Sequence, residues 1–197
     1  MKKWILFIAA ILLLCSSIAR ADDFENGVKA YQEGNYDQAI ELFRPLADQG
    51  DAGAQYNLGV TYDKGEGVIQ DYKEVVKWYR LAAKKGDATA QYNLGLMYDN
   101  GRGVTQDYKE AAKWYRLAAK QGHASAQYNL GVTYAKGEGV TQNYVRAHMW
   151  LNLATSKGNK TAKKYLKIVA KEMSPSQIAD AKKMARDCEK NNYKNCE

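Results

Sequence analysis

Histidine, proline and cysteine are scarce in this chain of 197 residues, which contains two histidines, two prolines and three cysteines. With so few prolines, long stretches can stay helical without interruption. The longest apolar run near the start, Trp4–Leu14, has 11 residues, whereas a transmembrane helix needs about 20. The sequence also lacks a G-x-S-x-G elbow, an H-E-x-x-H pair and a Walker loop. These absences argue against the common serine hydrolase, zinc protease and nucleotide-binding sites.

The first 21 residues have the layout of a secretory signal peptide. Lys2 and Lys3 precede the apolar run, and Ala19 and Ala21 stand at the −3 and −1 positions of a small-residue cleavage site. We therefore expect cleavage before Asp22 and a mature protein in the periplasm or the medium, without a transmembrane span.

The three cysteines suggest two kinds of modification, lipid attachment at one of them and a disulfide between the other two. Lipid attachment at Cys15 is an alternative to simple cleavage, but a lipoprotein signal normally has Gly, Ala or Ser before the cysteine, and this chain has Leu14. The other two, Cys188 and Cys196, form an even pair in a chain that we expect to be exported, which favours a disulfide. Two free thiols are the alternative.

Positive charge is concentrated at the C-terminal end. The chain has a net charge of +7, and loss of residues 1–21, which contain three basic and no acidic residues, would lower it to +4. Residues 22–156 carry a net charge of −2 and residues 157–197 a net charge of +6. A modest basic end is not by itself the footprint of a nucleic-acid-binding protein, and we expect no nucleic-acid partner.

A period of 36 residues dominates the sequence. Residues 51–86, 87–122 and 123–158 align without gaps; the first two are identical at 27 of 36 positions and the last two at 19 of 36. Each copy contains the hexapeptide A-Q-Y-N-L-G. Repeats of 20–50 residues are typical of solenoids, in which each unit buries its apolar face against its neighbours.

Each repeat has the apolar periodicity of two helices. In residues 51–86, Ala54, Leu58 and Tyr62 recur at i, i+4 and i+8, and a second stripe of helical period follows over residues 72–82. Glycine recurs on the first stripe of each copy, where it costs about 1 kcal/mol relative to alanine. We expect these glycines to let the partner helix approach closely: Gly59, Gly95 and Gly131.

The segment between the two helices is equally regular. Each copy has a G-x-G-V sequence, whose first glycine suits the left-handed residue that ends a helix. An aspartate with a glutamate three residues later follows, as Asp71 with Glu74 and Asp107 with Glu110, and this spacing predicts an N-cap with a capping box. The third copy has Asn143 and keeps only the cap.

These motifs closely resemble the Sel1-like repeat family. The pattern A-x-A-Q-Y-N-L-G-x-x-Y-x-x-G-x-G-V, followed in the first two copies by W-Y-x-x-A-A-x-x-G, recurs in the three copies, which cover 108 residues. Residues 22–50 look like a shorter unit, spaced more like a tetratricopeptide repeat without the G-x-G-V turn. In residues 51–86 the family's signature positions are Ala54, Leu58, Gly59, Tyr62, Gly65, Gly67, Val68, Trp78, Ala82 and Gly86.

The resemblance implies an all-α fold, a right-handed α/α superhelical solenoid of helix–turn–helix repeats. Because such proteins usually act as adaptors, we expect a protein or peptide partner, no enzymatic activity, no cofactor and a monomer. The predicted organisation is a signal peptide (1–21), a tetratricopeptide-like repeat (22–50), three Sel1-like repeats (51–86, 87–122 and 123–158), and C-terminal capping helices with a tail (159–197).

By the same resemblance, a partner would bind on the concave face, which the first helix of each repeat lines. Positions beside the packed stripe vary among the copies, whereas the stripe is constant. The alternative is that these positions are merely exposed to solvent and free to vary. The predicted groove residues are Tyr56, Val60, Asp63, Lys64, Tyr92, Leu96, Asp99, Asn100, Tyr128, Val132, Ala135 and Lys136.

Residues 159–197 are expected to cap the array. Residues 159–173 have the pattern of one helix with an apolar side and a basic stripe, and Ser174 before Pro175 predicts the start of a last helix. The basic stripe is either the solvated outer face of the cap or a dock for an acidic partner or anionic lipid. Its members are Lys160, Lys163, Lys164, Lys167 and Lys171.

The two histidines give no sign of a metal site. Neither His123 nor His148 has a Cys, Asp or Glu cluster at metal-ligand spacing, and His123 occupies the expected cap position of a helix. Two alternative functions remain. One is a cell-wall (penicillin or peptidoglycan) binding protein or weak hydrolase, as suggested for cysteine-rich exported relatives, although those carry cysteine pairs within their repeats. The other is a host-directed virulence factor.

Overall fold

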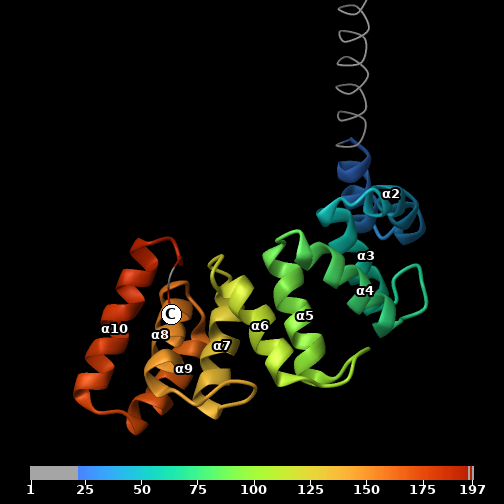
Figure 1. The fold of residues 1–197 in the computed structure, drawn as a ribbon. Helices are drawn as coiled ribbons and strands as arrows, with labels where there is room; N and C mark the ends of the chain where they lie inside the picture. Colours follow the sequence, from blue (N-terminus) through green and yellow to red (C-terminus); the bar gives the residue numbers. More distant parts are fainter. Residues whose placement is uncertain (1–21, 195, 197) are drawn as a thin grey trace, which may run out of the picture. The chain divides into compact units, whose positions relative to one another are not determined.

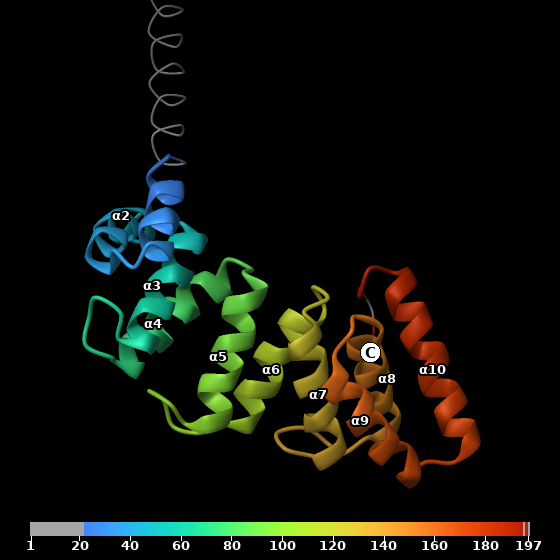
Figure 2. The ribbon, with the colours of Figure 1, turned by 180° about the vertical axis from the view of Figure 1, so that it is seen from behind.

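The computed structural model describes residues 22–194 and 196, which form two compact units, residues 22–82 and residues 83–196. In this part of the chain the regular elements are helices, and no strand occurs among the described residues (Figures 1 and 2). The predicted all-α fold of repeated helical pairs is therefore confirmed. The predicted signal peptide and the lipidation alternative at Cys15 fall outside the described residues.

The N-terminal unit is built from two successive helical pairs around one core. Its buried side chains include Phe43, Leu46 and Leu58, with Phe24 and Tyr62 packed at the edge. Residues 22–32 are helical. They are followed by α2 (Tyr36–Asp48), α3 (Ala52–Lys64) and α4 (Tyr72–Lys84), and the boundary between the units falls in the last turn of α4.

The C-terminal unit is a stack in which each helix packs on its neighbours. Contacts join α5 to α6, α6 to α7 and α7 to α8, and both α9 and α10 pack against α8 (Figures 1 and 2). The last two helices therefore close this end of the stack, as expected for a cap. The elements are α5 (Ala88–Asn100), α6 (Tyr108–Ala119), α7 (Ala124–Lys136), α8 (Tyr144–Ser156), α9 (Lys160–Val169), the short 3-10 helix η1 (Ala170–Glu172) and α10 (Pro175–Lys190).

Glycine in the first helix of each pair allows the second helix to approach closely. A Cβ atom at Gly95 would lie 2.6 Å from the ring of Tyr115, and one at Gly131 would lie 2.7 Å from Cγ of Leu151. Both distances are too short for real Cβ contacts, so the prediction for these glycines is confirmed. An equally close approach occurs between Gly59 and Tyr79 and, in the shorter first repeat, between Gly27 and Phe43.

The two glycines of each G-x-G-V turn have different roles. The first adopts the left-handed conformation that ends the helix, as predicted, with φ of 71°, 66° and 76° at Gly65, Gly101 and Gly137. The second, at Gly67 and Gly139, lies against the preceding helical pair. A Cβ at Gly139 would collide with the backbone of Tyr108, and one at Gly67 would collide with Tyr36. The turn therefore joins neighbouring pairs as well as linking its own two helices.

The predicted capping boxes at residues 71–74 and 107–110 form only in part. The Asp107 carboxylate does cap α6, since it accepts from the backbone N–H of Glu110 at 3.1 Å. The backbone N–H of Asp107, however, already donates to the Tyr98 carbonyl at 2.9 Å. The prediction of a complete capping box is therefore wrong, because the backbone N–H that its second half requires already donates to the preceding helix. A complete capping box occurs at Ser174 and Gln177, at the start of α10.

Candidate functional site

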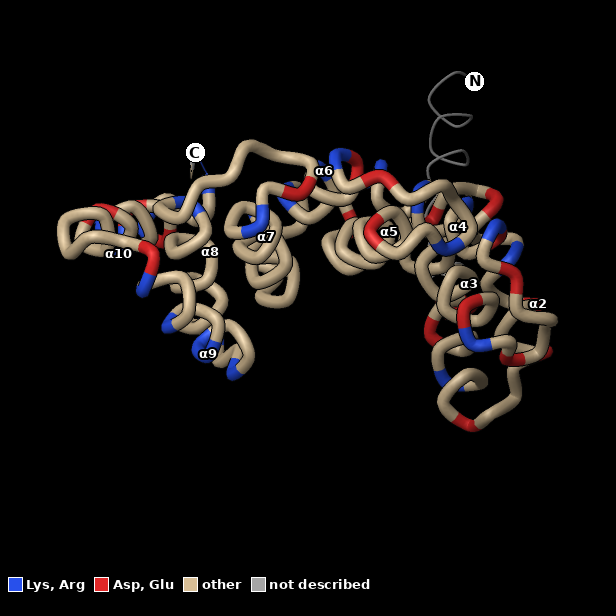
Figure 3. Tube along the Cα trace, turned by 90° about the horizontal axis from the view of Figure 1, so that it is seen from below, with Lys and Arg blue, Asp and Glu red and all other residues tan. Residues whose placement is uncertain are grey.

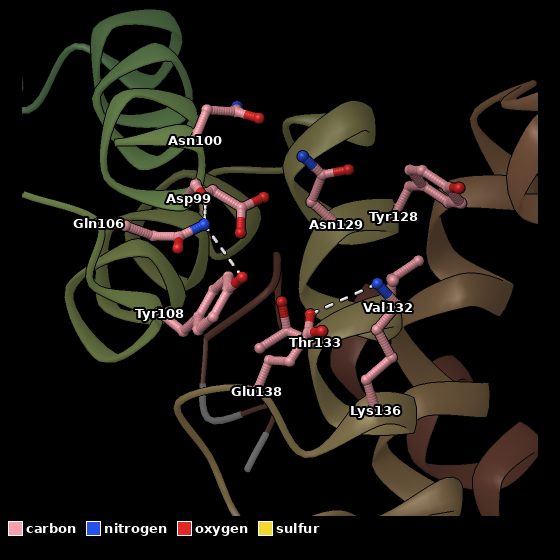
Figure 4. A pocket seen from close by; sticks show the side chains of 10 residues that line it. All are labelled: Asp99, Asn100, Gln106, Tyr108, Tyr128, Asn129, Val132, Thr133, Lys136 and Glu138. Atoms are coloured by element: carbon pink, nitrogen blue, oxygen red, sulfur yellow. Dashed lines mark hydrogen bonds and ion pairs between the residues drawn. The ribbon is translucent and has the colours of Figure 1, made fainter. Parts of the chain in front are cut away.

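In the C-terminal unit, α5 and α7 flank a pocket of about 290 Å³. These are the first helices of two successive repeats, so the pocket lies where the resemblance predicted a groove. Figure 4 shows side chains from α5 and the start of α6 on one side and side chains from α7 on the other. We call this the α5–α7 pocket. Its lining residues are Asp99, Asn100, Gln106, Tyr108, Tyr128, Asn129, Val132, Thr133, Lys136 and Glu138.

A buried tyrosine holds Asp99 at the edge of the pocket. The hydroxyl of Tyr115 donates to Oδ2 of Asp99 at 3.0 Å, and Tyr115 is only 1% exposed. Burial is the main reason that the pKa of Tyr115 lies far above its usual value, and the negative charge of Asp99 is the next. The phenol therefore stays protonated at neutral pH and continues to donate to the carboxylate.

Gln106 ties the turn after α5 into the wall of the pocket. Its Nε2 donates to the Asp99 carbonyl at 2.7 Å and contacts the Tyr108 hydroxyl at 3.0 Å. Gln142 does the same one repeat later, with the carbonyl of Ala135 at 2.8 Å and the hydroxyl of Tyr144 at 3.1 Å. Since its side-chain contacts recur in the next repeat, this turn is a regular part of the architecture.

The pocket carries groups of both charges. Nζ of Lys136 lies 3.5 Å from Oε2 of Glu138, and the carboxylate of Asp99 lies across the pocket (Figure 4). Nδ2 of Asn100 donates to the Leu96 carbonyl at 2.8 Å. The pocket thus combines carboxylate, ammonium, amide and hydroxyl groups, which suits hydrogen bonding to a polar peptide segment. No three His, Cys, Asp or Glu side chains of the described chain come together as a metal site would require.

The structure brings five of the twelve predicted groove residues to this pocket: Asp99, Asn100, Tyr128, Val132 and Lys136. Tyr92 instead stacks on His123, with ring centroids 4.7 Å apart, and Leu96 packs against the core. His123 also caps α7, as predicted, by accepting from the Ala126 N–H at 3.2 Å. Ala135 departs from the prediction. It is buried in the core with 7% exposure and cannot line a groove.

The four predicted residues of the first full repeat belong to the N-terminal unit. Tyr56 stacks on Tyr79, with ring centroids 5.8 Å apart. Lys64 donates to the hydroxyl of Tyr31 at 2.7 Å and pairs with Glu66 at 3.6 Å. The other two, Val60 and Asp63, are half-buried. In this unit Lys64 therefore already has partners within the chain.

Half of the pocket's lining was not predicted from the sequence. The residues that were missed come from the turns, from the first position of α6 and from the α7 face next to the predicted positions. The signal that could have found one of them is the glutamine that recurs after each G-x-G-V turn, at positions 70, 106 and 142. The missed residues are Gln106, Tyr108, Asn129, Thr133 and Glu138.

Cys188 and Cys196 form a disulfide with a Cα–Cα distance of 4.8 Å. Both cysteines are buried, so the bond pins the end of the chain to α10. The structure thus contains the predicted pair and not the two free thiols of the alternative. None of the helices formed by residues 22–194 is both long and apolar enough to cross a membrane.

Comparison with solved structures places this arrangement among Sel1 repeat proteins. The chain is similar to a protective antigen present in uropathogenic Escherichia coli strains, which displays an SLR fold, with 32% identity and a TM-score of 0.79 over 88% of this chain and 39% of that one. It is also similar to a Sel1 repeat protein from Oxalobacter formigenes, with 30% identity and a TM-score of 0.70 over 86% of this chain and 77% of that one. It shares its fold with Helicobacter pylori cysteine rich protein B, at 22% identity and a TM-score of 0.51 over 73% of this chain and 96% of that one.

Among curated proteins, the chain is similar to an exopolysaccharide production negative regulator of Rhizobium leguminosarum bv. viciae. The two are 40% identical over 50 residues, which are 25% of this chain and 19% of the regulator. The chain therefore spans about a fifth of the length of this curated relative and about two fifths of the E. coli antigen.

The Sel1 repeat family model matches most of the chain, in four segments: residues 24–51, 52–87, 88–123 and 124–159. The first match covers the segment in which we expected a tetratricopeptide-like unit. Together with the repeated helical pairs, these matches show that the chain belongs to the Sel1 repeat family.

Proposed function

We propose that this protein is a non-catalytic interaction scaffold that binds an extended segment of a partner protein in the α5–α7 pocket. Sel1 repeats generally mediate protein interactions, which supports the general role. The observation that carries the specific proposal is the pocket between the first helices of two successive repeats, lined mainly by polar side chains.

The size and chemistry of the pocket favour part of a peptide over a cofactor. Its volume of about 290 Å³ is at the lower end of the range for small-molecule sites, roughly 300–1,000 Å³. Its amide, carboxylate and ammonium groups can pair with backbone amides and polar side chains. A peptide would also gain apolar contact with Val132 and with the ring of Tyr128, which borders the pocket (Figure 4).

Site-specific photo-crosslinking tests the location of binding. Replacement of Val132 by the photoreactive residue p-benzoylphenylalanine should give adducts with a partner in cells that express the protein. The matched control carries the same residue at Leu117, which is 41% exposed on α6 and does not line the pocket. Adducts at Val132 and none at Leu117 support the proposal, whereas equal labelling at both positions would count against it.

Affinity measurements then test the chemistry. A synthetic peptide covering the crosslinked segment should bind the purified protein, and Asn100→Ala with Lys136→Ala should weaken its affinity by about tenfold, since each lost hydrogen bond contributes about 0.5–1.5 kcal/mol. Lys73→Ala with Lys109→Ala, at exposed positions outside the pocket, serves as the control. Unchanged affinity in the pocket variant, with helicity preserved in both, would exclude this site.

We further propose that the protein is exported after cleavage before Asp22. The signal-like pattern of residues 1–21 supports export, and so does the Cys188–Cys196 disulfide, because such bonds persist in oxidising compartments. Protein isolated from the periplasm or the medium should begin at Asp22 when its N-terminus is sequenced. Recovery of a chain that still begins at Met1 from the cytosol would contradict export.

A further inference from the structure

The helix α9 presents a basic face that contains no acidic residue. Four of the five lysines of the basic stripe lie on α9, the fifth, Lys171, lies in η1, and all five are exposed. At 100° per residue, the four side chains on α9 fall within an arc of about 100°. The opposite side of α9 carries Ala162 and Val169, which are buried against the rest of the unit. Figure 3 shows basic positions and no acidic position along α9.

Several exposed lysines on other helices have a carboxylate three or four positions away: Lys77 pairs with Glu74 at 3.0 Å, and Lys183 pairs with Asp187 at 2.9 Å. None of the five lysines of the basic stripe forms such an ion pair with a residue that the structure describes.

The spacing of these lysines also places like charges next to one another. Lys160, Lys164 and Lys167 are separated by four and three residues, and like charges at these spacings destabilise a helix. A face that needed only to be solvated could carry both charges, as α4, α6 and α10 do. An anionic partner would relieve the repulsion, so the arrangement favours a partner with a high density of negative charge.

An exposed apolar side chain lies at the edge of this basic face. Ile168 is 56% exposed, and it follows Lys164 by one helical turn. A helix that lies on a membrane surface combines lysines at the level of the headgroups with apolar side chains at the boundary of the acyl chains. An acidic protein segment would engage the lysines but would gain little from Ile168.

We propose that α9 and η1 dock this protein on an anionic phospholipid surface, with the five lysines at the headgroups and Ile168 at the acyl boundary. This docking does not depend on peptide binding in the α5–α7 pocket. Electrostatic attraction contributes most of the affinity, since each lysine near an anionic surface adds to it and added salt screens it.

Vesicle sedimentation tests the proposal with the purified protein. It should bind vesicles of phosphatidylglycerol and phosphatidylcholine, should release them at high salt, and should bind phosphatidylcholine vesicles much more weakly. Replacement of Lys160, Lys163, Lys164 and Lys167 by glutamine should lower the partition coefficient on anionic vesicles by at least about tenfold. A matched variant removes the same charge from exposed positions on or next to α4 and α6: Lys73→Gln, Lys84→Gln, Lys85→Gln and Lys109→Gln.

The matched variant should bind as the unaltered protein does, and any contribution of residues 1–21 would appear equally in both variants. Ile168→Ser should weaken binding to anionic vesicles severalfold and leave binding to soluble polyglutamate unchanged. The absence of a preference for anionic vesicles, or an equal loss in the two charge variants, would overturn the proposal. Binding to polyglutamate without binding to vesicles would also overturn it and would indicate an acidic protein partner.

Discussion

At the scale of single residues, the absence of a side chain determines how closely the paired helices pack. Gly95 lies against the ring of Tyr115, and no other residue type fits there without displacing that ring. The displacement would reach further than this pair, because the Tyr115 hydroxyl also holds Asp99 at the pocket. Stability and the geometry of the α5–α7 pocket are therefore linked through one glycine.

Gly95→Ala should destabilise the protein. Overpacking typically costs about 1–3 kcal/mol, and the better helix propensity of alanine returns about 1 kcal/mol, so we expect a net loss of up to about 2 kcal/mol. Urea unfolding followed by circular dichroism measures this difference. Thr89→Ala, at an exposed position of the same helix, should stay within about 0.5 kcal/mol of the original chain. A Gly95→Ala variant of unchanged stability would show that Tyr115 moves aside freely.

His148 makes the stability of the C-terminal unit depend on pH. The side chain is 2% exposed, and its Nδ1 has no hydrogen-bond partner among the described residues. Burial, and then the positive charge of Lys182, lowers the pKa of His148 below its usual value of about 6.5. The unfolded chain therefore binds a proton at a higher pH than the folded chain does, and stability falls as the pH drops below about 6.5.

We expect the urea midpoint to fall between neutral pH and about pH 5, and His148→Gln should reduce that fall. Burial also lowers the pKa of His123, so this histidine too makes the stability fall as the pH drops. The comparison is therefore best made in a His123→Asn background, since asparagine is a good N-cap. If His148→Gln leaves the slope of stability against pH unchanged in that background, the buried imidazole is not its source.

At the scale of elements, a buried glutamine joins each repeat to the one before it. Nε2 of Gln91 donates to the carbonyl of Ala83 at 3.0 Å, and Gln127 donates to the carbonyl of Ala119 at 3.2 Å. Gln55 makes the same bond within the N-terminal unit. Each acceptor lies in the last turn of a helix, where it also accepts from the backbone N–H three residues later. The recurring Q of A-Q-Y-N-L-G thus connects repeats through hydrogen bonds.

Gln91→Leu should weaken this connection. The change removes one donor to the Ala83 carbonyl, which keeps the Gly86 N–H at 3.1 Å, and the acceptor that Gln121 uses at 2.9 Å, and each lost hydrogen bond contributes about 0.5–1.5 kcal/mol. Thermal unfolding and hydrogen exchange at the α4–α5 junction measure the effect. The same substitution at the exposed Gln38 should change little. Equal effects at the two positions would mean that the hydrogen bond adds no specific stability.

At the scale of the whole molecule, the repeat array needs a stable end, and the C-terminal disulfide contributes to it. Residues after α10 turn back, so that the N–H of Tyr193 donates to the Cys188 carbonyl at 2.9 Å. The ring of Tyr193 also contacts Lys157, whose Nζ lies 4.7 Å from its centroid. The disulfide holds this tail against the last helices of the stack.

Reduction of the disulfide should lower the melting temperature without a large loss of helicity. A loop this short contributes somewhat less than about 3 kcal/mol in the chain-entropy model. The double variant Cys188→Ala with Cys196→Ala should melt at a lower temperature and should not respond to reductant. A melting temperature of the original chain that is unaffected by complete reduction would show that the tail packs equally well without the bond.

Much of the fold could be predicted because its determinants act locally and recur. Apolar stripes of helical period, left-handed glycines and N-cap residues specify each helix through neighbours in the chain, and the 36-residue period shows that the pairs are equivalent. The capping boxes were the exception, since the competing bond of the Asp107 N–H comes from α5, nine residues earlier.

The sequence by itself thus determined the helical pairs, their order and the cysteine pair available for a disulfide. Only the tertiary structure decided which equivalent positions form a site. Asp99 and Ala135 occupy the same place in successive repeats, yet one borders the pocket and the other is buried. Tyr92 and Tyr128 are equivalent too, but His123 covers Tyr92, whereas Tyr128 borders the pocket. Exposure depends on what the neighbouring element places above a residue, and a repeat pattern does not contain that information.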